Sequence, residues 1–488
     1  MSLRPRQSRR QGILPFVVQR GEGTEVTARA GLPLVVETLR ALRLDEKVRA
    51  DLHIAKRQRG FSELEKLEAV VSLIAAGGDR VEDIHILAED KGLLRLLDRT
   101  FPSPDALLEF LYAFDDPSAW EGRPPDEASW VPPENGPLAA LADINVALVE
   151  RAADRKTTTA TIDHDGTIIE SHKRTATVAY EGTKGYQPLV ALWAEQDLIV
   201  TDEFRDGNVP GGKDPLSSVR RAFDALPPWV EKRYFRADSA DYYTPLLKYL
   251  VKEQIAFSIS ADMSPELRAC CTALPDKSWE LLEERERESA HVAEVEFTPG
   301  DWPKNAAPLR YVALRLTPKQ PELFEERGPK YLAVVTNRPA PSAEPTEEPT
   351  PTTASSEQRD DEKLTAKELV RWHWGKAGTV EHINRVLKDE LAAGVLPSQK
   401  FGANAAWFRI NVLTHNLLTF LRRRVLPERY RFARPKRLRF DYFTLPGRLA
   451  EHQRQLTVNV SAGDERTAEI IEARQRLLAM REKLARRE

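Results

Sequence analysis

Residues 157–260 constrain the fold more than any other part of the chain, because three strand-like runs open this segment without a helix between them. Thr157–Ile162, Thr175–Tyr180 and Leu189–Trp193 are rich in β-branched and aromatic residues, and Leu198–Thr201 extends the third. In a simple strand–helix–strand repeat a helix would follow each strand. No such repeat therefore fits this segment.

The second half of the segment alternates helices and strands. A helix is predicted near Pro215–Ala225, a strand over Tyr234–Ala237, a helix over Asp241–Glu253 and a strand over Ile255–Ser260. Together with the three opening strands, this order predicts an α/β fold with a ribonuclease-H-like sheet. In such a sheet the first and fourth strands are neighbours, so acidic residues at their ends can meet.

Acidic residues follow two of these strands directly, Asp163 after the first and Asp238 after the fourth. A carboxylate at a strand end is held by a rigid element while its oxygens face solvent. Two such acids and one from a helix can hold two divalent ions about 3.5–4 Å apart, an arrangement that promotes phosphoryl transfer. Carboxylate oxygens with open water positions suit Mg²⁺ or Mn²⁺. Asp165, in the predicted turn, is the alternative first ligand.

The third acid, Glu381, lies on a helix predicted over Val380–Lys388. The pattern Thr365–Glu368 is a capping box that begins this helical region, and Gly375 and Gly378 predict a break within it. A carboxylate followed two turns later by a lysine on the same face can bind metal and contact a DNA phosphate. The predicted polar face consists of Glu381, Asn384, Arg385 and Lys388, at helical spacing.

These motifs resemble those of bacterial insertion-sequence DDE transposases, in the cut-and-paste branch with a β-rich insertion before the final Glu. Asp163 matches the first motif, within Ile162–Thr167, and Asp238 matches the second, within Phe235–Ser239. Glu381 and Lys388 match the last two members of the Tyr-Arg-Glu-Lys motif of that branch. The resemblance covers roughly residues 90–450 and includes Gly185–Leu189, Asp206–Asn208 and Phe401–Ala405.

Two positions depart from the Tyr-Arg-Glu-Lys motif. Trp374 stands at the Tyr position, and Ala377 stands at the Arg position, four residues before Glu381. A tryptophan can still stack near a phosphate or a base, whereas alanine cannot contact phosphate. Lys376, one residue away, is the candidate to replace the arginine.

The resemblance implies a transposase whose catalytic and metal-binding residues are Asp163, Asp238 and Glu381, with two Mg²⁺ or Mn²⁺ ions. It implies cleavage and strand transfer of transposon ends, with excision through hairpin ends. The implied partners are double-stranded DNA, as terminal inverted repeats and as target, and a second copy of the chain in a homodimer on DNA. The alternatives are a weakened or domesticated copy that only binds DNA, which Ala377 favours, and a ribonuclease-H-like nuclease without strand transfer.

Charge is segregated along the chain, although the net charge is only −3. Residues 421–440 hold nine basic residues and one acidic residue, with three aromatic residues among them. Clustered arginine suits DNA because each phosphate contact releases condensed counterions; the alternative is a solvated helix face followed by an Arg-rich loop. The predicted DNA contacts are Arg422, Arg423, Arg424, Arg385, Lys388, Lys376 and Trp374.

At 488 residues the chain is too long for one ordinary core. It has no apolar run of about 18 residues, so no membrane span is expected. Adjacent Cys270 and Cys271 suit neither an ordinary disulfide nor a zinc cage, which favours a reducing, cytoplasmic location. The resemblance implies a bacterium, with nucleoid association when the protein is bound to DNA. The predicted divisions are a disordered tail (1–20), a helical DNA-binding domain (21–117), a linker (118–137), the first part of the catalytic core (138–260), an inserted antiparallel β domain (261–363) with a disordered loop at 337–363, the second part of the core (364–425), and a basic, helical C-terminal region (426–488).

Overall fold

The computed structural model describes residues 26–54, 60–319, 328–341, 363–453, 455–461 and 463–486. The predicted tail 1–20, and residues 342–362 of the predicted loop, lie outside these ranges. Among the described helices, none is both long enough and apolar enough to cross a bilayer.

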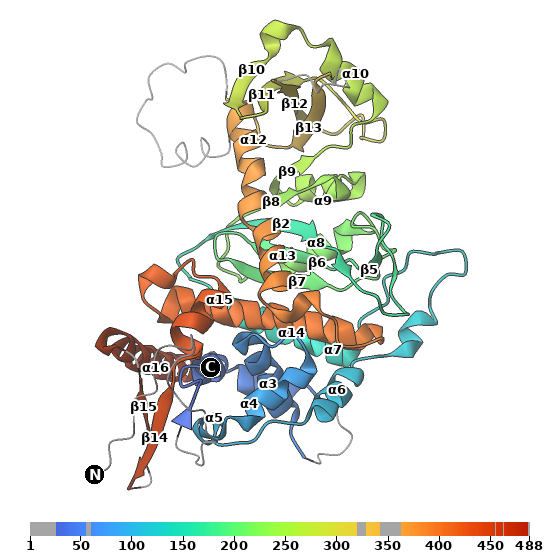
Figure 1. The fold of residues 1–488 in the computed structure, drawn as a ribbon. Coiled ribbons are helices and arrows are strands. Elements are labelled where there is room, and N and C mark those ends of the chain that lie inside the picture. Colours follow the sequence, from blue (N-terminus) through green and yellow to red (C-terminus); the bar gives the residue numbers. More distant parts are fainter. Residues whose placement is uncertain are drawn as a thin grey trace, which may run out of the picture.

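A nine-stranded mixed sheet runs through the upper half of the molecule (Figure 1). Its core strands are β2 (Thr159–Gly166), β6 (Leu189–Trp193), β7 (Leu198–Glu203), β8 (Lys232–Ala237) and β9 (Ala256–Ser260). They lie in the order β9-β8-β2-β6-β7, with β7, β6 and β2 antiparallel and β2, β8 and β9 parallel. The predicted neighbours, β2 as the first strand and β8 as the fourth, lie side by side.

The second and third strands of this sheet differ from the prediction. Of the predicted strand Thr175–Tyr180, only β4 (Thr177–Val178) forms, in a small separate sheet with β3 (Ile169–Glu170) and β5 (Lys184–Tyr186). Residues 198–203 do not extend β6 but turn back beside it as β7, because Asp197 takes a left-handed φ of 56° in the tight turn between them. The pair β6–β7 therefore supplies the second and third strands.

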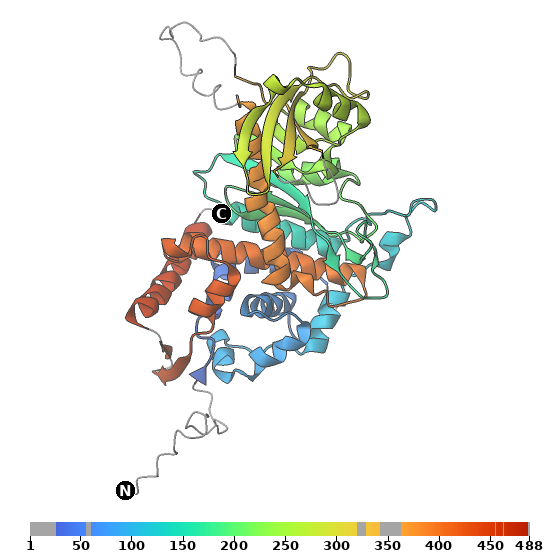
Figure 2. The ribbon, with the colours of Figure 1, turned by 45° about the horizontal axis from the view of Figure 1, so that its top comes forward.

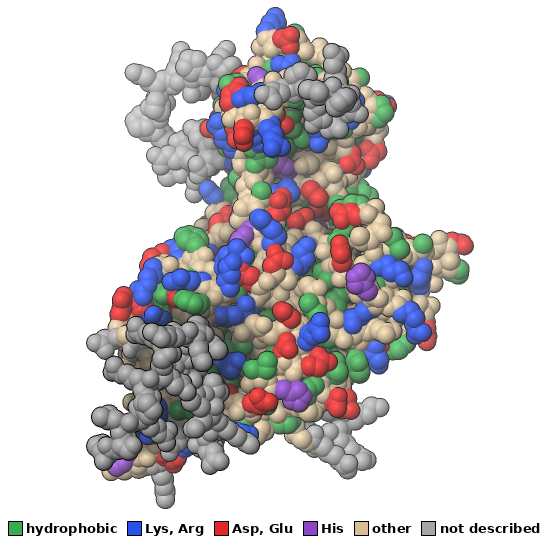
Figure 3. Space-filling view, in the orientation of Figure 1, with side chains coloured by type: hydrophobic (Ala, Val, Ile, Leu, Met, Phe, Trp, Pro, Cys, Tyr) green, Lys and Arg blue, Asp and Glu red, His purple; other side chains and the backbone are tan. Residues whose placement is uncertain are grey.

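The strands of the insertion extend the core sheet. They are β10 (Glu280–Glu284), β11 (Glu288–Val295), β12 (Arg310–Pro318) and β13 (Lys330–Thr336), and each is antiparallel to the next. The last of them, β13, pairs with β9, so the sheet is continuous from the core into the upper lobe. The sequence predicted three of these strands but neither β10 nor their union with the core sheet. The space-filling view shows the upper lobe above a narrower waist (Figure 3).

Two helices placed end to end connect the upper lobe to the core (Figures 1 and 2). α12 (Ala366–Trp374) begins at the predicted capping box, in which Thr365 and Glu368 each accept a hydrogen bond from the other's backbone amide. α13 (Val380–Asp389) follows after a 3₁₀ turn, η6 (Gly375–Gly378), so the predicted break is confirmed. A Cβ atom at Gly375 would overlap Nη1 of Arg236, so a side chain here would displace that guanidinium.

A long buried helix, α14 (Phe401–Phe420), joins the sheet to the N-terminal helices. It packs against β7 and α7 (Gly136–Ala152) on one side and against α3 (Glu63–Ala76) on the other. Apolar side chains of all these elements form one continuous core. The remaining N-terminal helices are α1 (Pro33–Ala41), α2 (Leu44–Asp51), α4 (Ile84–Glu89), α5 (Lys91–Leu97) and α6 (Pro104–Tyr112).

The C-terminal part returns to the N-terminal helices. After α14 come a π-turn (Leu421–Val425) and the short helix α15 (Pro435–Leu438). A final long helix, α16 (Asp464–Ala485), packs against α1. A second small sheet pairs β1 (Val26–Thr27), β14 (Gly447–His452) and β15 (Gln455–Val460).

Candidate active site

The parallel pairing of β2 with β8 brings two aspartates of the sequence motifs together. In this register Asp163 lies opposite Arg236 and His164 opposite Ala237. The register continued by one residue sets Asp165 beside Asp238, the residue after β8. Because side chains alternate along a strand, Asp163 and Asp165 point to the same face of the sheet.

Asp163 lies inside β2, not after the strand as predicted, because β2 runs on to Gly166. Its side chain is fully buried. Arg236 donates two hydrogen bonds to it, Nε to Oδ1 at 2.7 Å and Nη2 to Oδ2 at 2.8 Å, and the Thr379 hydroxyl donates a third to Oδ2. A bidentate arginine satisfies and neutralises a carboxylate. Asp163 therefore fastens the turn before α13 to the sheet.

Neighbouring contacts fasten α12 to the same strands. The third nitrogen of the Arg236 guanidinium, Nη1, donates to the carbonyl of Trp372 at 2.6 Å. The two ring nitrogens of His373 form hydrogen bonds with the hydroxyls of Ser258 and Ser260, both at 3.0 Å. Burial, with smaller effects of Lys376 and Arg236, lowers the pKa of His373 to about 3, so the ring is neutral at physiological pH. The segment that leads to Glu381 is thus held at two successive points.

Asp165 is the aspartate that lies among the other predicted acids. It accepts a hydrogen bond from Asn384 Nδ2 of α13 at 3.0 Å. Burial and the negative charges of Asp238 and Glu381 raise the pKa of Asp165 to about 6, while the positive charge of Lys376 opposes them. A carboxyl group with a raised pKa beside other carboxylates is typical of a functional site.

Asp238 begins a 3₁₀ turn, Ser239–Asp241, in which its Oδ1 accepts a hydrogen bond from the amide of Ala240 at 2.9 Å. Burial and then the charge of Asp241 raise the pKa of Asp238, while Lys376 opposes them. His164 points to the other face of β2 and forms hydrogen bonds with Asp241, at 2.9 Å, and with Ser218, at 3.1 Å. The buried His164 therefore lies behind the acids rather than among them.

Lys376 supplies the positive charge of this cluster. Its Nζ donates to Glu381 Oε1 at 3.0 Å, and its side chain is 13% exposed, against 44% for Glu381. Burial lowers the pKa of Lys376, but the bond to Glu381 and the charges of Asp165 and Asp238 outweigh burial and raise it. We call Asp165, Asp238, Glu381 and Lys376 the carboxylate cluster.

The predicted polar face of α13 is divided between two surroundings. Asn384 bonds to Asp165, and Lys388 Nζ donates to the carbonyl of Ile168 at 3.4 Å, so both face the sheet. Arg385 does not join them, because it is exposed and lines a groove on another side of the helix.

The other predicted DNA contacts lie away from the carboxylate cluster. The Trp374 ring lies 4.6 Å from the Arg285 guanidinium, against the insertion. Arg422 is buried and bonds to Asp197 and to the carbonyl of Arg431. Burial and then the charge of Arg423 lower its pKa to about 10. Arg423 donates to the carbonyl of Glu195 at 2.8 Å, and Arg424 pairs with Asp154 at 2.9 Å.

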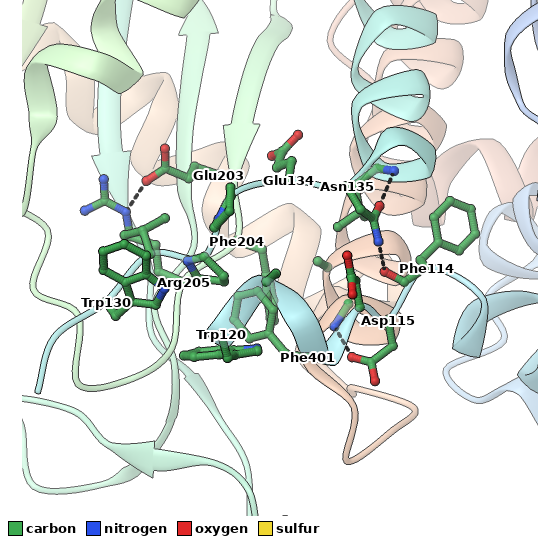
Figure 4. Close-up of a pocket in the computed structure, with 18 of the residues that line it drawn as sticks. Phe114, Asp115, Trp120, Trp130, Glu134, Asn135, Glu203, Phe204, Arg205 and Phe401 are labelled. Carbon is green, nitrogen blue, oxygen red and sulfur yellow. Dashed lines mark hydrogen bonds and ion pairs between the residues drawn. The ribbon is translucent and has the colours of Figure 1, made fainter. Parts of the chain in front are cut away.

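The pocket drawn in Figure 4, of about 470 Å³, is not part of the cluster. The predicted linker encloses it, with Trp120 stacked edge-on against Phe401 at 5.3 Å between ring centroids. Several of its charged residues form ion pairs, Glu203 with both Arg205 and Arg221 and Lys213 with Glu127. The predicted linker is therefore packed against the core.

The donor set of the carboxylate cluster fits a divalent cation. Asp165, Asp238 and Glu381 offer hard oxygen ligands, and Asn384 Oδ1 is a buried oxygen without a hydrogen-bond partner in the described part of the chain. Within the described ranges no three His, Cys, Asp or Glu side chains form a metal-binding group, and Lys376 bonds to Glu381.

The comparisons with known proteins identify the family of the chain. Residues 14–482 match the family model described as transposase DDE domain group 1. No curated protein matches. The chain is similar to a solved structure described as a cryo-EM structure of piggyBac transposase synaptic complex with hairpin DNA, at 11% identity and a TM-score of 0.41, covering 93% of this chain and 79% of that chain, an overlap too loose to transfer any feature. Because the family model spans nearly the whole chain, including every element that carries the cluster, the chain belongs to the DDE transposases, enzymes that cut DNA and transfer the cut strands.

Proposed function

We propose that this transposase cleaves and joins transposon ends at Asp165, Asp238 and Glu381. The observation that supports the assignment is the position of Lys376, which bonds to Glu381 at 3.0 Å and whose charge acts on both Asp165 and Asp238. Asp163, which the sequence favoured as the first ligand, is already neutralised by Arg236 and is fully buried. Asp165 therefore replaces it in the proposed triad.

The three carboxylates would hold two Mg²⁺ or Mn²⁺ ions. Bound ions of this kind lower the pKa of an attacking water or 3′ hydroxyl and stabilise the leaving oxygen. Asn384 orients Asp165 through its amide, and the amide of Ala240 orients Asp238. Both aspartates are thus fixed by groups on rigid elements before DNA binds.

Lys376 takes the place of the arginine that Ala377 removes from the motif. In the free protein its ammonium lies among the carboxylates and offsets their mutual repulsion. With cations bound, Glu381 would serve as a ligand, and Lys376 would be free to contact a phosphate of the DNA.

The same proposal includes an insertion-sequence origin in a bacterium, a homodimer on DNA and excision through hairpin ends. Two ends of one element must be cut together, and each chain carries one carboxylate cluster, which supports the dimer. A labelled-end assay on a supercoiled plasmid tests the chemistry, since a transposase joins its ends to target whereas a nuclease only cuts. Hairpin ends would appear as covalently closed products on a denaturing gel.

The test of the site compares two aspartates of one strand. Asp165→Asn should abolish Mn²⁺-dependent cleavage of a terminal-repeat substrate while DNA binding persists. Asp163→Asn should retain cleavage in whatever fraction of the protein stays folded. Cleavage by folded Asp165→Asn would return the first-ligand role to Asp163. The absence of arginine at Ala377 favours a DNA-binding remnant as the second candidate, which wild-type protein that binds DNA but never cuts it in Mn²⁺ would establish.

A further inference from the structure

A basic groove lies beside the helix that carries Glu381, on a different side from the carboxylates. It has a volume of about 600 Å³ and runs between α13 and the segment that follows α14. α13 contributes His382 and Arg385 to it, and residues 422–438 contribute four arginines and Phe432. A single helix, about 10 Å across, therefore separates this groove from the proposed active site.

Part of the positive charge of the groove has no carboxylate in contact. Arg385 is exposed and forms no hydrogen bond or ion pair with any residue of the described ranges. Arg423 donates to the carbonyl of Glu195, and no carboxylate of the described part of the chain pairs with it. The other three arginines are partnered by acids: Arg422 by Asp197, which also lines the groove, Arg431 by Glu428 and Arg434 by Glu390.

Two further observations indicate that the groove has a positive potential and a hydrogen-bond donor without a partner. The Nε of Arg434 is buried without a hydrogen-bond partner in the described structure. In the space-filling view, Lys and Arg side chains gather on the side of the molecule where Figure 1 places α13 and α15 (Figure 3). An anion is the ligand that such a groove attracts.

Phe432 identifies which kind of anion fits. Its side chain is 82% exposed at the groove, with the Arg431 guanidinium 5.7 Å from the ring centroid. An aromatic ring beside arginines is the pattern by which proteins hold single-stranded nucleic acid, because bases stack on the ring while phosphates pair with the cations. A duplex hides the faces of its bases, and a cavity of about 600 Å³ is in the range that holds one small ligand, such as a nucleotide.

We propose that this groove binds single-stranded DNA, namely the strand end released by cleavage next to Glu381. Arg385 and Arg423 contact its phosphates, and Phe432 stacks on one base. The inference rests on the proposed function for the source of the strand, but binding itself needs neither cations nor chemistry.

The test measures binding of the full chain to a fluorescent oligothymidine and to a duplex of equal length, in EDTA, by anisotropy. Phe432→Ala should weaken single-strand binding about 5- to 150-fold, the range expected for one stacked base. Its matched control is Phe440→Ala, since Phe440 is 73% exposed with the Arg437 guanidinium 5.9 Å from its ring but does not line the groove. The control should bind like the wild type.

Arg385→Ala should reduce the slope of log affinity against log salt by about 0.7, the value for one phosphate contact on a single strand. Arg424→Ala, an exposed arginine outside the groove, is its control. Equal losses in Phe432→Ala and Phe440→Ala, or a loss on duplex as large as that on the single strand, would overturn the proposal. Asp165→Asn should bind oligothymidine normally, so failure of the catalytic assignment and failure of the groove give different results.

Discussion

Two ion pairs of the site, Arg236–Asp163 on the sheet and Lys376–Glu381 at the start of α13, differ in burial and in function. Arg236 and Asp163 form a bidentate pair in which the carboxylate is fully buried and its oxygens are satisfied. Lys376 and Glu381 share one hydrogen bond, and Glu381 remains 44% exposed with other carboxylates nearby. The first pair holds the segment before α13 in place, and the second can be exchanged. The difference shows how to choose a metal ligand among the acidic residues of a motif. An acid whose charge another residue already neutralises is a structural residue, and an acid without such a partner is the candidate ligand.

The largest effect is expected on the rate of DNA cleavage when Glu381, the acid of the exchangeable pair, is changed. Glu381→Gln should slow strand cleavage by about 10³-fold or more, equivalent to about 4 kcal/mol of barrier, because a neutral amide is a poor cation ligand. The free energy of unfolding should change little. Single-turnover cleavage of a labelled end measures the rate, and Asp389→Asn, an exposed acid on the same helix, is the control. Cleavage at the wild-type rate would remove Glu381 from the proposed triad.

For the Arg236–Asp163 pair we expect the main effect on stability instead of on the cleavage rate. Asp163→Asn should lower the free energy of unfolding by about 3–5 kcal/mol, because it leaves the buried Arg236 charge without a partner. Asp165→Asn should not lower it, since the change relieves repulsion from Asp238 and Glu381. Urea denaturation of both variants measures the contrast. A double variant, Asp163→Leu with Arg236→Met, should recover part of the loss, and equal stability of the two single variants would contradict the comparison.

Removing the ammonium of Lys376 tests whether the Lys376–Glu381 pair can be exchanged for a cation. Lys376→Met leaves the three carboxylates without their internal cation, so Mn²⁺ should bind about tenfold more tightly, equivalent to about 1.4 kcal/mol. Isothermal titration calorimetry measures this without any turnover. Lys388→Met, a lysine of α13 whose Nζ contacts the carbonyl of Ile168, is the control. Weaker Mn²⁺ binding in Lys376→Met would mean that Lys376 assists cation binding instead of competing with it.

The smallest effect concerns pH and the fastening of α12. Burial lowers the pKa of His373 to about 3, below the value of about 6.5 in an unfolded chain. The neutral ring therefore stabilises the fold fully above pH 6.5, and this stabilisation is lost as the pH falls toward 3. His373→Asn should be less stable at pH 8 but lose less stability between pH 7.5 and pH 5. Denaturation at both pH values checks this against His452→Asn, an exposed histidine, and identical pH slopes would exclude the role.

Much of the core was predictable from the sequence, because it rests on local patterns. The alternation of helices and strands from Pro215 to Ser260 and the break at Gly375 follow from periodicity, capping and glycine. Asp238 and Glu381 were predicted as ligands from a strand end, a helical pattern and the family motifs together. Asp165 was ranked second because polar residues after Ile162 suggested that the strand had ended, whereas β2 continues to Gly166.

What the sequence did not reveal depends on contacts between distant segments. Buried polar residues in β2 are stable only because Arg236 and Asp241 satisfy Asp163 and His164. One sequence signal could have indicated the Asp163–Arg236 pair. Arg236 stands two residues before Asp238, and Asp163 stands two residues before Asp165, so parallel strands that set Asp165 beside Asp238 also set Asp163 beside Arg236. The pairing of β13 with β9, and the burial of Arg422 against Asp197, leave no local pattern at all.

The union of the insertion with the core sheet has a mechanical consequence. Backbone hydrogen bonds run without interruption from β10 through β13 and β9 to β8, the strand that ends one residue before Asp238. α12 ties the same lobe to the turn before Glu381. The upper lobe is therefore connected directly to the segments that carry Asp238 and Glu381, two of the three proposed ligands. A movement of this lobe on bound DNA would change the distances between the carboxylates.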